Sequence, residues 1–290
     1  MTKCASLRAD TLSSPFSGPD ISLTRSAIRK TLRMASRMAA RRRTRRVIVL
    51  MYHAIGHSAY AVHPDVFEAQ MDYLHTHAKV VGLDEIVSES TCSTPSRLTC
   101  AITFDDGYAG VHEYAYPILQ RYRFPAVVYV TTSALDRSDG NKSEPIPGFF
   151  PSEPTLSWAA TREMSDGGIT IGSHLCHHLN MAKLSLEVAA QELNRSKEII
   201  SQRLSAPCSH FAYPSGLYSE KTVDCVRTAG YRSAVTVRHS VVPDEIDLFR
   251  IPRMGLGPMN SWADFEGMLS GDLDYLLITR AIWRTLRLNV

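Results

Sequence analysis

The sequence predicts an α/β fold in which parallel strands alternate with helices. Short runs rich in apolar and β-branched residues recur along the chain, and segments with helical spacing of apolar residues separate them. Three polar motifs follow such runs directly, at residues 103–107, 172–178 and 211–216. Strand–helix–strand alternation requires crossover connections, so the strands should form a barrel or an open doubly wound sheet. Chemistry in such sheets is found where the strands end, which makes the three motifs the candidate site.

Length and composition fit one large domain with an extension at either end. The chain has 290 residues, of which 44% are hydrophobic, enough to build one sizeable core. Its net charge of +3 conceals an asymmetry: no Asp or Glu occurs from Ile21 to Pro64, whereas ten Lys and Arg lie within residues 21–46. The remainder is acidic, so we expect no nucleic-acid partner for the folded part. The six cysteines lack C-x-x-C spacing and are expected to be mostly reduced or buried.

Residues 1–46 and 271–290 are predicted to be extensions. Residues 1–20 are rich in Ser, Thr and Pro and should be disordered. Arginines then recur every four residues beside apolar positions, so a helix here would be basic and amphipathic and could lie on an anionic membrane, and the C-terminal tail is again basic and amphipathic. A solvated tail, an organelle-type transit sequence, or a later start at Met34 or Met38 are the alternatives for the N-terminal segment. Because no apolar stretch fits a secretory signal or a spanning helix, we expect a cytoplasmic protein, with peripheral contact to the inner face of the membrane as a further hypothesis.

The elements of the folded part alternate regularly from residue 47 onward. Strands are predicted at 47–52, 80–81, 98–104, 126–132, 169–173, 210–213 and 232–237. Helices are predicted around 67–74, 84–87, 108–122, 158–164, 186–204, 219–230 (with Ser219 as its cap) and 262–269. Residues 134–155 contain four prolines and several Ser, Asp and Gly, which is typical of a loop or lid.

The first motif, Thr103-Phe104-Asp105-Asp106-Gly107, ends a buried strand with two carboxylates and a glycine turn. Successive strand residues point to opposite sides, so one aspartate can hold a cation while the other faces a substrate. Asp-Asp-Gly is also ordinary turn chemistry, so partners elsewhere in the chain must decide between the two interpretations.

The second motif, Gly172-Ser173-His174-Leu175-Cys176-His177-His178, follows another strand. On one helical turn, His174 and His178 would lie on the same side and could reach one metal ion. With Asp106 they would make a set of two histidines and one carboxylate. Surface or core histidines are the alternative, and His177 could substitute for either ligand.

The third motif, Phe211-Ala212-Tyr213-Pro214-Ser215-Gly216, also ends a strand, and its turn could expose backbone amides toward the site. In this order the three motifs resemble those of the polysaccharide deacetylases, carbohydrate esterases that share the nodulation-factor deacetylase homology domain. Supporting stretches are Met51-Tyr52-His53, Leu156-Ser157-Trp158, Ala229-Gly230-Tyr231 and Arg250-Ile251-Pro252-Arg253, so the resemblance covers roughly residues 47–256.

The resemblance implies a distorted (β/α) barrel with a catalytic domain at residues 47–270. It implies that Asp105 is the general base, and that Asp106, His174 and His178 bind one divalent metal ion. Imidazole and carboxylate ligands suit Zn²⁺, with Co²⁺, Ni²⁺ or Mn²⁺ as alternatives. An amide resists hydrolysis, so a cation must polarise the carbonyl and acidify water while a carboxylate accepts the proton. The matching oxyanion donor is the Ser215 N–H, and Tyr213 and Pro214 of the same motif are expected to contact substrate.

The chain departs from the family pattern at two positions. Ala212 stands where an arginine is common, and Leu175 where a hydroxyl residue is common. This indicates the divergent branch with a Tyr-Pro-x-Gly third motif. In that branch Arg253 could supply the missing positive charge beside Asp105, with Arg250 as the weaker alternative.

The proton donor and the sugar contacts are left open. A late Leu-x-His that would carry the usual donor is not visible, so His53 and His239 are candidates, and either could be a structural histidine. Trp158 could stack on a sugar ring or pack in the core.

The function that follows is removal of N-acetyl groups from a glycan, exopolysaccharide or glycan precursor by a metal-dependent hydrolase. Two alternatives stay open. One is hydrolysis of a non-sugar amide, and the other is a weakly active glycan-binding scaffold tethered by its basic ends.

Overall fold

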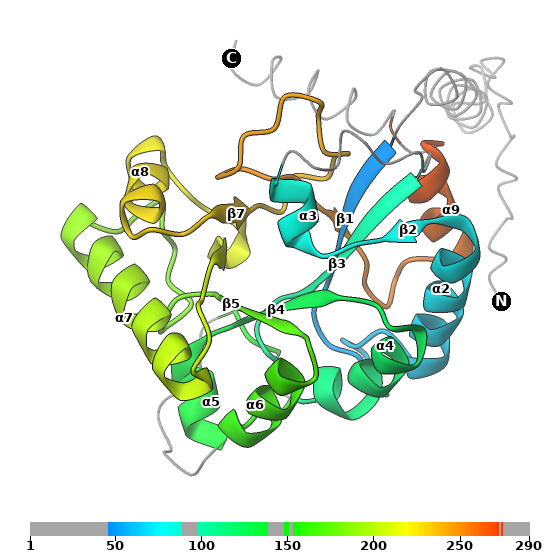
Figure 1. The fold of residues 1–290 in the computed structure, drawn as a ribbon, viewed down its shortest axis with the longest axis horizontal. Coiled ribbons are helices and arrows are strands. Elements are labelled where there is room, and N and C mark those ends of the chain that lie inside the picture. Colours follow the sequence, from blue (N-terminus) through cyan, green and yellow to red (C-terminus); the bar gives the residue numbers. More distant parts are fainter. Residues whose placement is uncertain (1–45, 89–97, 139–147, 151–152, 273, 275–290) are drawn as a thin grey trace, which may run out of the picture.

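A parallel β-sheet surrounded by helices forms the centre of the protein in a computed structural model that describes residues 46–88, 98–138, 148–150, 153–272 and 274 (Figure 1). Neighbouring strands follow the order β7-β6-β5-β4-β3-β1-β8, β2 pairs with β3 beside this path, and every pairing is parallel. The strands are β1 (Arg46–Tyr52), β2 (Lys79–Val80), β3 (Leu98–Phe104), β4 (Ala126–Val130), β5 (Thr170–Ser173), β6 (His210–Ala212), β7 (Ser233–Val235) and β8 (Met254–Gly255).

Residues 251–255, here called the closing segment, join the two ends of this sheet. Ile251 forms a parallel bridge with Val235 in β7, and Met254 pairs with Leu50 in β1. The sheet therefore closes into a distorted (β/α) barrel, as predicted, and the open doubly wound alternative is excluded.

Alternate strand residues face either the barrel interior or the helices. One buried cluster gathers side chains from many strands and fills the interior: it includes Val49, Ala101, Val127, Tyr129, Ala212, Val235 and Ile251. The intervening positions, such as Leu50, Ile102 and Val128, belong to the larger cluster that also contains helix residues. A period of two along each strand thus separates the interior from the outer layer.

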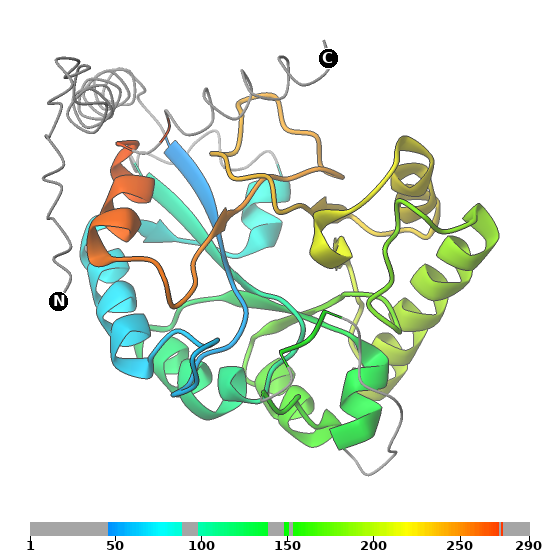
Figure 2. The same cartoon turned by 180° about the vertical axis from the view of Figure 1, so that it is seen from behind.

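The helices run along the outside of the sheet (Figures 1 and 2). Ser185 and Ser219 cap α7 and α8 by accepting hydrogen bonds from N–H groups in the first turn, which confirms the predicted cap at Ser219. The helical elements are α2 (Pro64–His77), α3 (Leu83–Val87), η2 (Val111–Ala115), α4 (Tyr116–Tyr122), α5 (Thr132–Ser138), α6 (Trp158–Asp166), α7 (Leu186–Leu204), η3 (Pro214–Gly216), α8 (Glu220–Thr228) and α9 (Trp262–Ser270).

Most boundaries differ from the sequence prediction by a few residues, and two of the differences bear on the site. The helix expected at 108–122 begins later, because Asp106 and Gly107 have φ of 71° and 73° and turn the chain before η2. The strand expected at 126–132 ends at Val130, and α5 occupies the first residues of the predicted loop 134–155.

The predicted terminal extensions lie almost entirely outside the described residues. Arg46, assigned to the extension, is instead the first residue of β1, and its guanidinium contacts both carboxylate oxygens of Asp274 at 2.7 Å. In the described part of the chain no helix is long and apolar enough to span a membrane. Four cysteines there are free, and Cys100, Cys176 and Cys208 are buried, as expected.

Candidate active site

The predicted site residues meet at one end of the barrel because all its strands run in the same direction. Asp105 and Asp106 follow β3, and His174 follows β5. The Asp105 N–H donates to Tyr52 O and the His174 N–H to Val130 O, so each backbone is held by the neighbouring strand.

Asp105 forms a fully buried ion pair with Arg253 of the closing segment. The Nη1 and Nη2 atoms of Arg253 lie 2.6 Å from Oδ1 and Oδ2 of Asp105, and Arg253 is 0% exposed. The guanidinium also donates to Thr103 Oγ1 and Thr236 O. Burial raises the pKa of Asp105, but the charge and hydrogen bonds of Arg253 outweigh it and lower that pKa to about 2.

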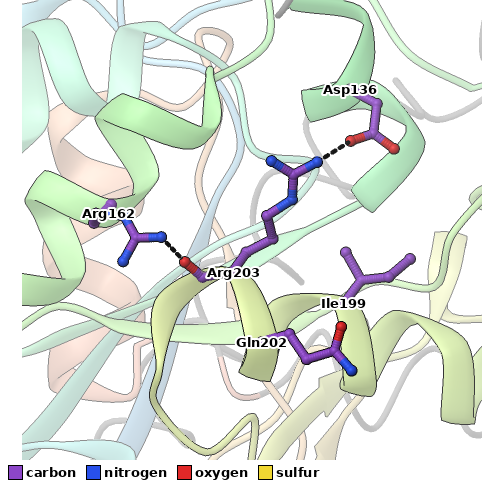
Figure 3. Close-up of a pocket in the computed structure, with 5 residues that line it drawn as sticks. All are labelled: Asp136, Arg162, Ile199, Gln202 and Arg203. Atoms are coloured by element: carbon purple, nitrogen blue, oxygen red, sulfur yellow. Dashed lines mark hydrogen bonds and ion pairs between the residues drawn. The ribbon is translucent and has the colours of Figure 1, made fainter.

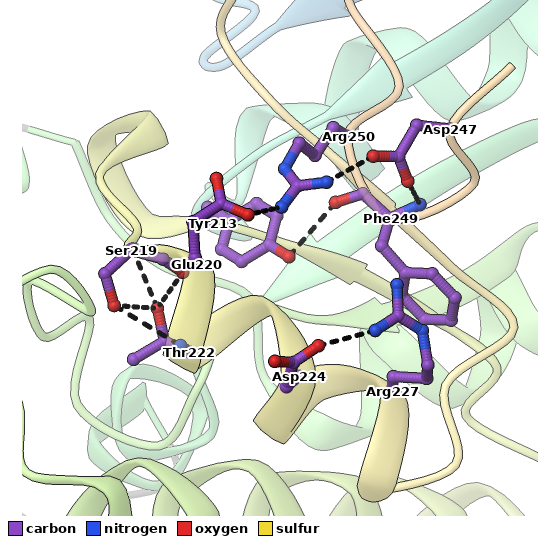
Figure 4. Close-up of polar contacts among 9 residues, drawn as sticks. All are labelled: Tyr213, Ser219, Glu220, Thr222, Asp224, Arg227, Asp247, Phe249 and Arg250. Carbon is purple, nitrogen blue, oxygen red and sulfur yellow. Dashed lines mark hydrogen bonds and ion pairs between the residues drawn. The ribbon is translucent and has the colours of Figure 1, made fainter.

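The structure distinguishes the two arginines that the sequence left as alternatives. Arg250 forms ion pairs with Asp247 and Glu220 instead, on the side of the barrel near α8 (Figure 4). Arg253 is therefore the arginine beside Asp105.

Asp106, His174 and His178 form a second buried group, in which the possible ligand atoms all lie within 4.8 Å of one another. Asp106 Oδ1 is 3.4 Å from His174 Nε2 and 3.5 Å from His178 Nε2. Burial raises the pKa of Asp106, but a hydrogen bond and the charge of His174 outweigh it, and the net shift is downward. For His174 burial lowers the pKa, whereas Asp106 and Asp105 raise it, and the net shift is upward.

The two histidines do not share a helical turn, as the sequence analysis assumed. They stand in a tight turn in which Leu175 and His178 have φ of 67° and 52°. Left-handed backbone at two non-glycine residues is unfavourable unless the surroundings enforce it.

Glu192 of α7 enforces that turn, and the sequence analysis missed it. Its Oε2 accepts the N–H groups of Cys176 and His177 at 3.1 Å, and its Oε1 lies 2.7 Å from His177 Nδ1. His177 is thus paired with Glu192, outside the group of Asp106, His174 and His178. The missed signal is a carboxylate on the inward side of a long amphipathic helix.

Tyr213 of the third motif is corrected by the structure. Its side chain is buried, and its hydroxyl donates to Phe249 O (Figure 4). The residue therefore supports the barrel wall and does not offer its ring to a ligand. Pro214 is buried as well, whereas Ser215 is exposed and has φ of 53°.

Trp158 is the second correction among the predicted substrate contacts. It is 5% exposed, its Nε1 donates to Asp136 Oδ1 at 2.8 Å, and the guanidinium of Arg203 lies over its ring. The nearby surface pocket is lined by Asp136, Arg162, Ile199, Gln202 and Arg203, and contains none of the acidic or histidine residues of the site (Figure 3). Core packing accounts for Trp158.

The two candidate proton donors differ in their surroundings. His53 lies close enough to Asp105 and Asp106 for its charge to lower the pKa of both. His239 follows Arg238, whose carbonyl accepts the Arg253 N–H, so it stands at the same end of the barrel.

The same site motifs are found in a known protein family. The family model described as polysaccharide deacetylase matches residues 93–234 of this chain. The chain belongs to the polysaccharide deacetylase family. YxkH of Bacillus subtilis, named as a polysaccharide deacetylase, is 26% identical over 220 residues, which cover 75% of this chain and 74% of YxkH.

One further protein sequence and one solved structure are also similar to this chain. The poly-β-1,6-N-acetyl-D-glucosamine N-deacetylase of Staphylococcus aureus is 24% identical over 205 residues, 67% of each protein. The solved structure of the Streptococcus pyogenes deacetylase PplD in complex with acetate superposes with a TM-score of 0.67 at 23% identity, covering 78% of this chain and 99% of that one. That superposition shows the same fold.

The residues present fit the divalent metal ion that the resemblance implies. The Nδ1–H of His174 donates to Ala212 O at 2.8 Å, which leaves Nε2 without a proton in the neutral ring and directs it toward Asp106. A backbone carbonyl on the second nitrogen is the usual arrangement of a metal-binding histidine. Two imidazoles and a carboxylate, of which Asp106 and His174 are buried and His178 is partly buried, leave further coordination positions for water and substrate.

Proposed function

We propose that this protein removes N-acetyl groups from an N-acetylated glycan by metal-dependent hydrolysis. The observation that carries the proposal is the juxtaposition of Asp105, paired with Arg253, and the group of Asp106, His174 and His178. The first supplies an oriented base and the second a ligand set, and amide hydrolysis needs both.

Asp105 would accept the proton of the attacking water at a carboxylate oxygen. Two hydrogen bonds from Arg253 hold its plane and keep it ionised, so the base is available well below neutral pH. Both oxygens retain a further lone pair for the water, because a carboxylate offers about four acceptor positions.

Asp106, His174 and His178 would hold the divalent cation. When bound, the cation polarises the acetyl carbonyl and makes water more acidic. The Ser215 N–H would donate to the oxyanion that forms when water attacks the acetyl carbonyl. Ser215 lies in an exposed turn with positive φ, and its N–H has no hydrogen-bond partner among the described residues. His53 is the better placed of the two candidate donors for the leaving amine, because it adjoins both aspartates.

The substrate class rests on the family and on the names of its members. The relative from Staphylococcus aureus is named for poly-β-1,6-N-acetyl-D-glucosamine, which makes such oligomers the first substrates to test. We assign the activity to residues 47–270, which contain every residue of the site.

Acetate release from N-acetylglucosamine oligomers tests the proposal directly. We expect release by the purified protein, loss after treatment with a chelator, and recovery when Zn²⁺, Co²⁺, Ni²⁺ or Mn²⁺ is restored. Small cyclic and linear amides without a sugar serve as controls. Turnover of those amides alone would refute deacetylation of glycans, and oligomer binding without acetate release would indicate a binding protein.

A further inference from the structure

An aromatic stack leads from the site to the surface, and none of its rings belongs to the three motifs. The stack consists of Tyr108, Phe150 and Tyr60. The ring centroids of Tyr108 and Phe150 lie 5.5 Å apart with planes 15° from parallel, and those of Phe150 and Tyr60 lie 4.9 Å apart at 13°. The three rings are thus nearly parallel.

The inner end of the stack touches the proposed metal ligands. Tyr108 follows Asp106 by two residues in the chain, and its hydroxyl accepts a hydrogen bond from the Phe150 N–H at 2.9 Å. Phe149 packs against Tyr108 and meets the His178 ring edge-on at 5.4 Å. A ligand at Asp106 would therefore lie at the inner end of the stack.

The outer end is exposed and firmly held. Tyr60 is 45% exposed although one face of its ring is covered by Phe150. Its loop is closed at the base by hydrogen bonds between Gly56 and Val62 and between Val62 and Ala54. The Tyr60 N–H also donates to Ser58 Oγ, so the ring is presented on ordered backbone.

Hydrophobic packing explains the inner rings but not the outer one. Ala54, Ala61 and Tyr108 form a small buried cluster against which Phe149 and Phe150 pack. Tyr60 is not part of that cluster and is 45% exposed, so the part of its ring that Phe150 leaves uncovered could contact a ligand. A pyranose ring with equatorial substituents has C–H bonds on both faces, and these are attracted to the negative face of an aromatic ring.

We propose that Tyr60 is a subsite that stacks on a sugar ring flanking the one that is deacetylated. The proposal rests on the function proposed above and sharpens it, because such a subsite favours oligomers over single sugars. Tyr60 would take the place that the sequence analysis gave to Trp158.

The test compares kcat/KM for acetate release from N-acetylglucosamine and from its β-1,6-linked pentamer. In Tyr60→Ala the ratio of pentamer to monosaccharide should fall about 2- to 12-fold, the contribution of one aromatic contact. Tyr60→Phe should keep the wild-type ratio because it keeps the ring face. Trp262→Ala is the matched control, since Trp262 is 42% exposed on α9 and packs against Tyr73 and Phe265.

A pentamer-to-monosaccharide ratio in Tyr60→Ala equal to that of the wild type would overturn the subsite. If kcat/KM fell equally on both substrates, the ring would only support the site. If kcat/KM changed on neither substrate while binding to phosphatidylglycerol vesicles was lost, the ring would be a membrane contact.

A binding measurement separates this proposal from the proposed function. The pentamer is titrated into Asp105→Asn protein with and without Tyr60→Ala. Weaker binding in the double variant supports the subsite even if the wild type releases no acetate, an outcome that would refute deacetylation alone. Equal binding would overturn the subsite while leaving deacetylation intact.

Discussion

Asp105 and Asp106 are neighbours in the chain, but the protein holds their surroundings in different ways. Asp105 is fixed from inside the barrel by Arg253, whose guanidinium is bound by β3 and by the backbone after β7. Asp106 meets His174 and His178 in turns beyond the strands, and the histidine turn is held from outside by Glu192. The comparison indicates that the proposed base depends on barrel closure and the proposed ligands on one helix.

The two regions should therefore fail separately when they are mutated. Substitutions in the turns that carry the proposed metal ligands should change the affinity for metal. Substitutions at the ion pair inside the barrel should lower the rate of deacetylation while the metal stays bound. The four predictions below test this separation, from the largest expected effect to the smallest.

The double variant His174→Ala, His178→Ala should lose both metal and activity. Only Asp106 would remain of the three ligands, and one carboxylate cannot retain a divalent ion against buffer. Metal content per chain is the measurement, and His177→Ala, which removes an imidazole paired with Glu192, is the control. Undiminished metal in the double variant would show that the ligands are elsewhere.

Asp105→Asn should keep the fold and the metal but lose most of the rate. The amide cannot accept the water proton, and removal of a general base costs about 10²- to 10⁴-fold. The measurement is kcat on saturating oligomer with metal content determined in parallel. Turnover close to the wild type would exclude Asp105 as the base.

Arg253→Ala should lower kcat about 10- to 100-fold with little change in KM, because a base that is no longer oriented is misplaced for the reaction. Arg253→Lys should recover only part of the rate, since one ammonium cannot reproduce the two parallel hydrogen bonds. Arg250→Ala is the control, as Arg250 pairs with Asp247 and Glu220.

The pH profile of Arg253→Ala gives a second readout. Burial raises the pKa of Asp105, whereas the charge and hydrogen bonds of Arg253, together with the charges of His174 and His53, lower it, and the net pKa is about 2. Without the guanidinium that pKa rises, so the base is protonated, and activity lost, at higher pH than in the wild type. An acidic limb at its original position would assign Arg253 a purely structural role.

Glu192→Gln should weaken metal binding about 10- to 100-fold while kcat at saturating metal changes little. One amide oxygen cannot accept both backbone N–H groups and also pair with His177 as the carboxylate does. Competition with a chelator measures the affinity, and Glu198→Gln on the same helix is the control because Glu198 accepts a hydrogen bond from Gln202, away from the histidine turn. Equal affinities in the two variants would show that the turn does not need Glu192.

Local patterns in the sequence were sufficient for parallel strands alternating with helices and for the proximity of the motifs, whereas the choice of a barrel over an open sheet came from the resemblance to the polysaccharide deacetylases. The strand before Asp105 and the helix after Ser219 are visible in apolar spacing and capping residues. Parallel strands then bring residues that follow them to one end. The sequence left core packing open for Trp158 and did not show that the Tyr213 ring is buried, because an aromatic residue beside a motif looks the same whether its ring is buried or exposed.

Other features depend on contacts between distant residues and could not be read from spacing. Glu192 acts through partners that the fold alone brings near, and Tyr60 through a ring at position 150. Arg253 was predicted beside Asp105 from the family resemblance and not from spacing. The conformation of the histidine turn was also misjudged, since a spacing of four residues suits a helical turn equally well.

The closing segment has a consequence for how the protein is made. Arg253 is separated from Asp105 by 148 residues, so a growing chain synthesises the carboxylate long before its partner. Until residues 251–255 dock, β1 and β7 are open sheet edges and Asp105 would be buried without a counterion, a state that costs about 3 to 5 kcal/mol. Docking of one short strand completes the barrel and orients the proposed base at the same time. An incompletely folded chain should therefore be unable to carry out the proposed deacetylation.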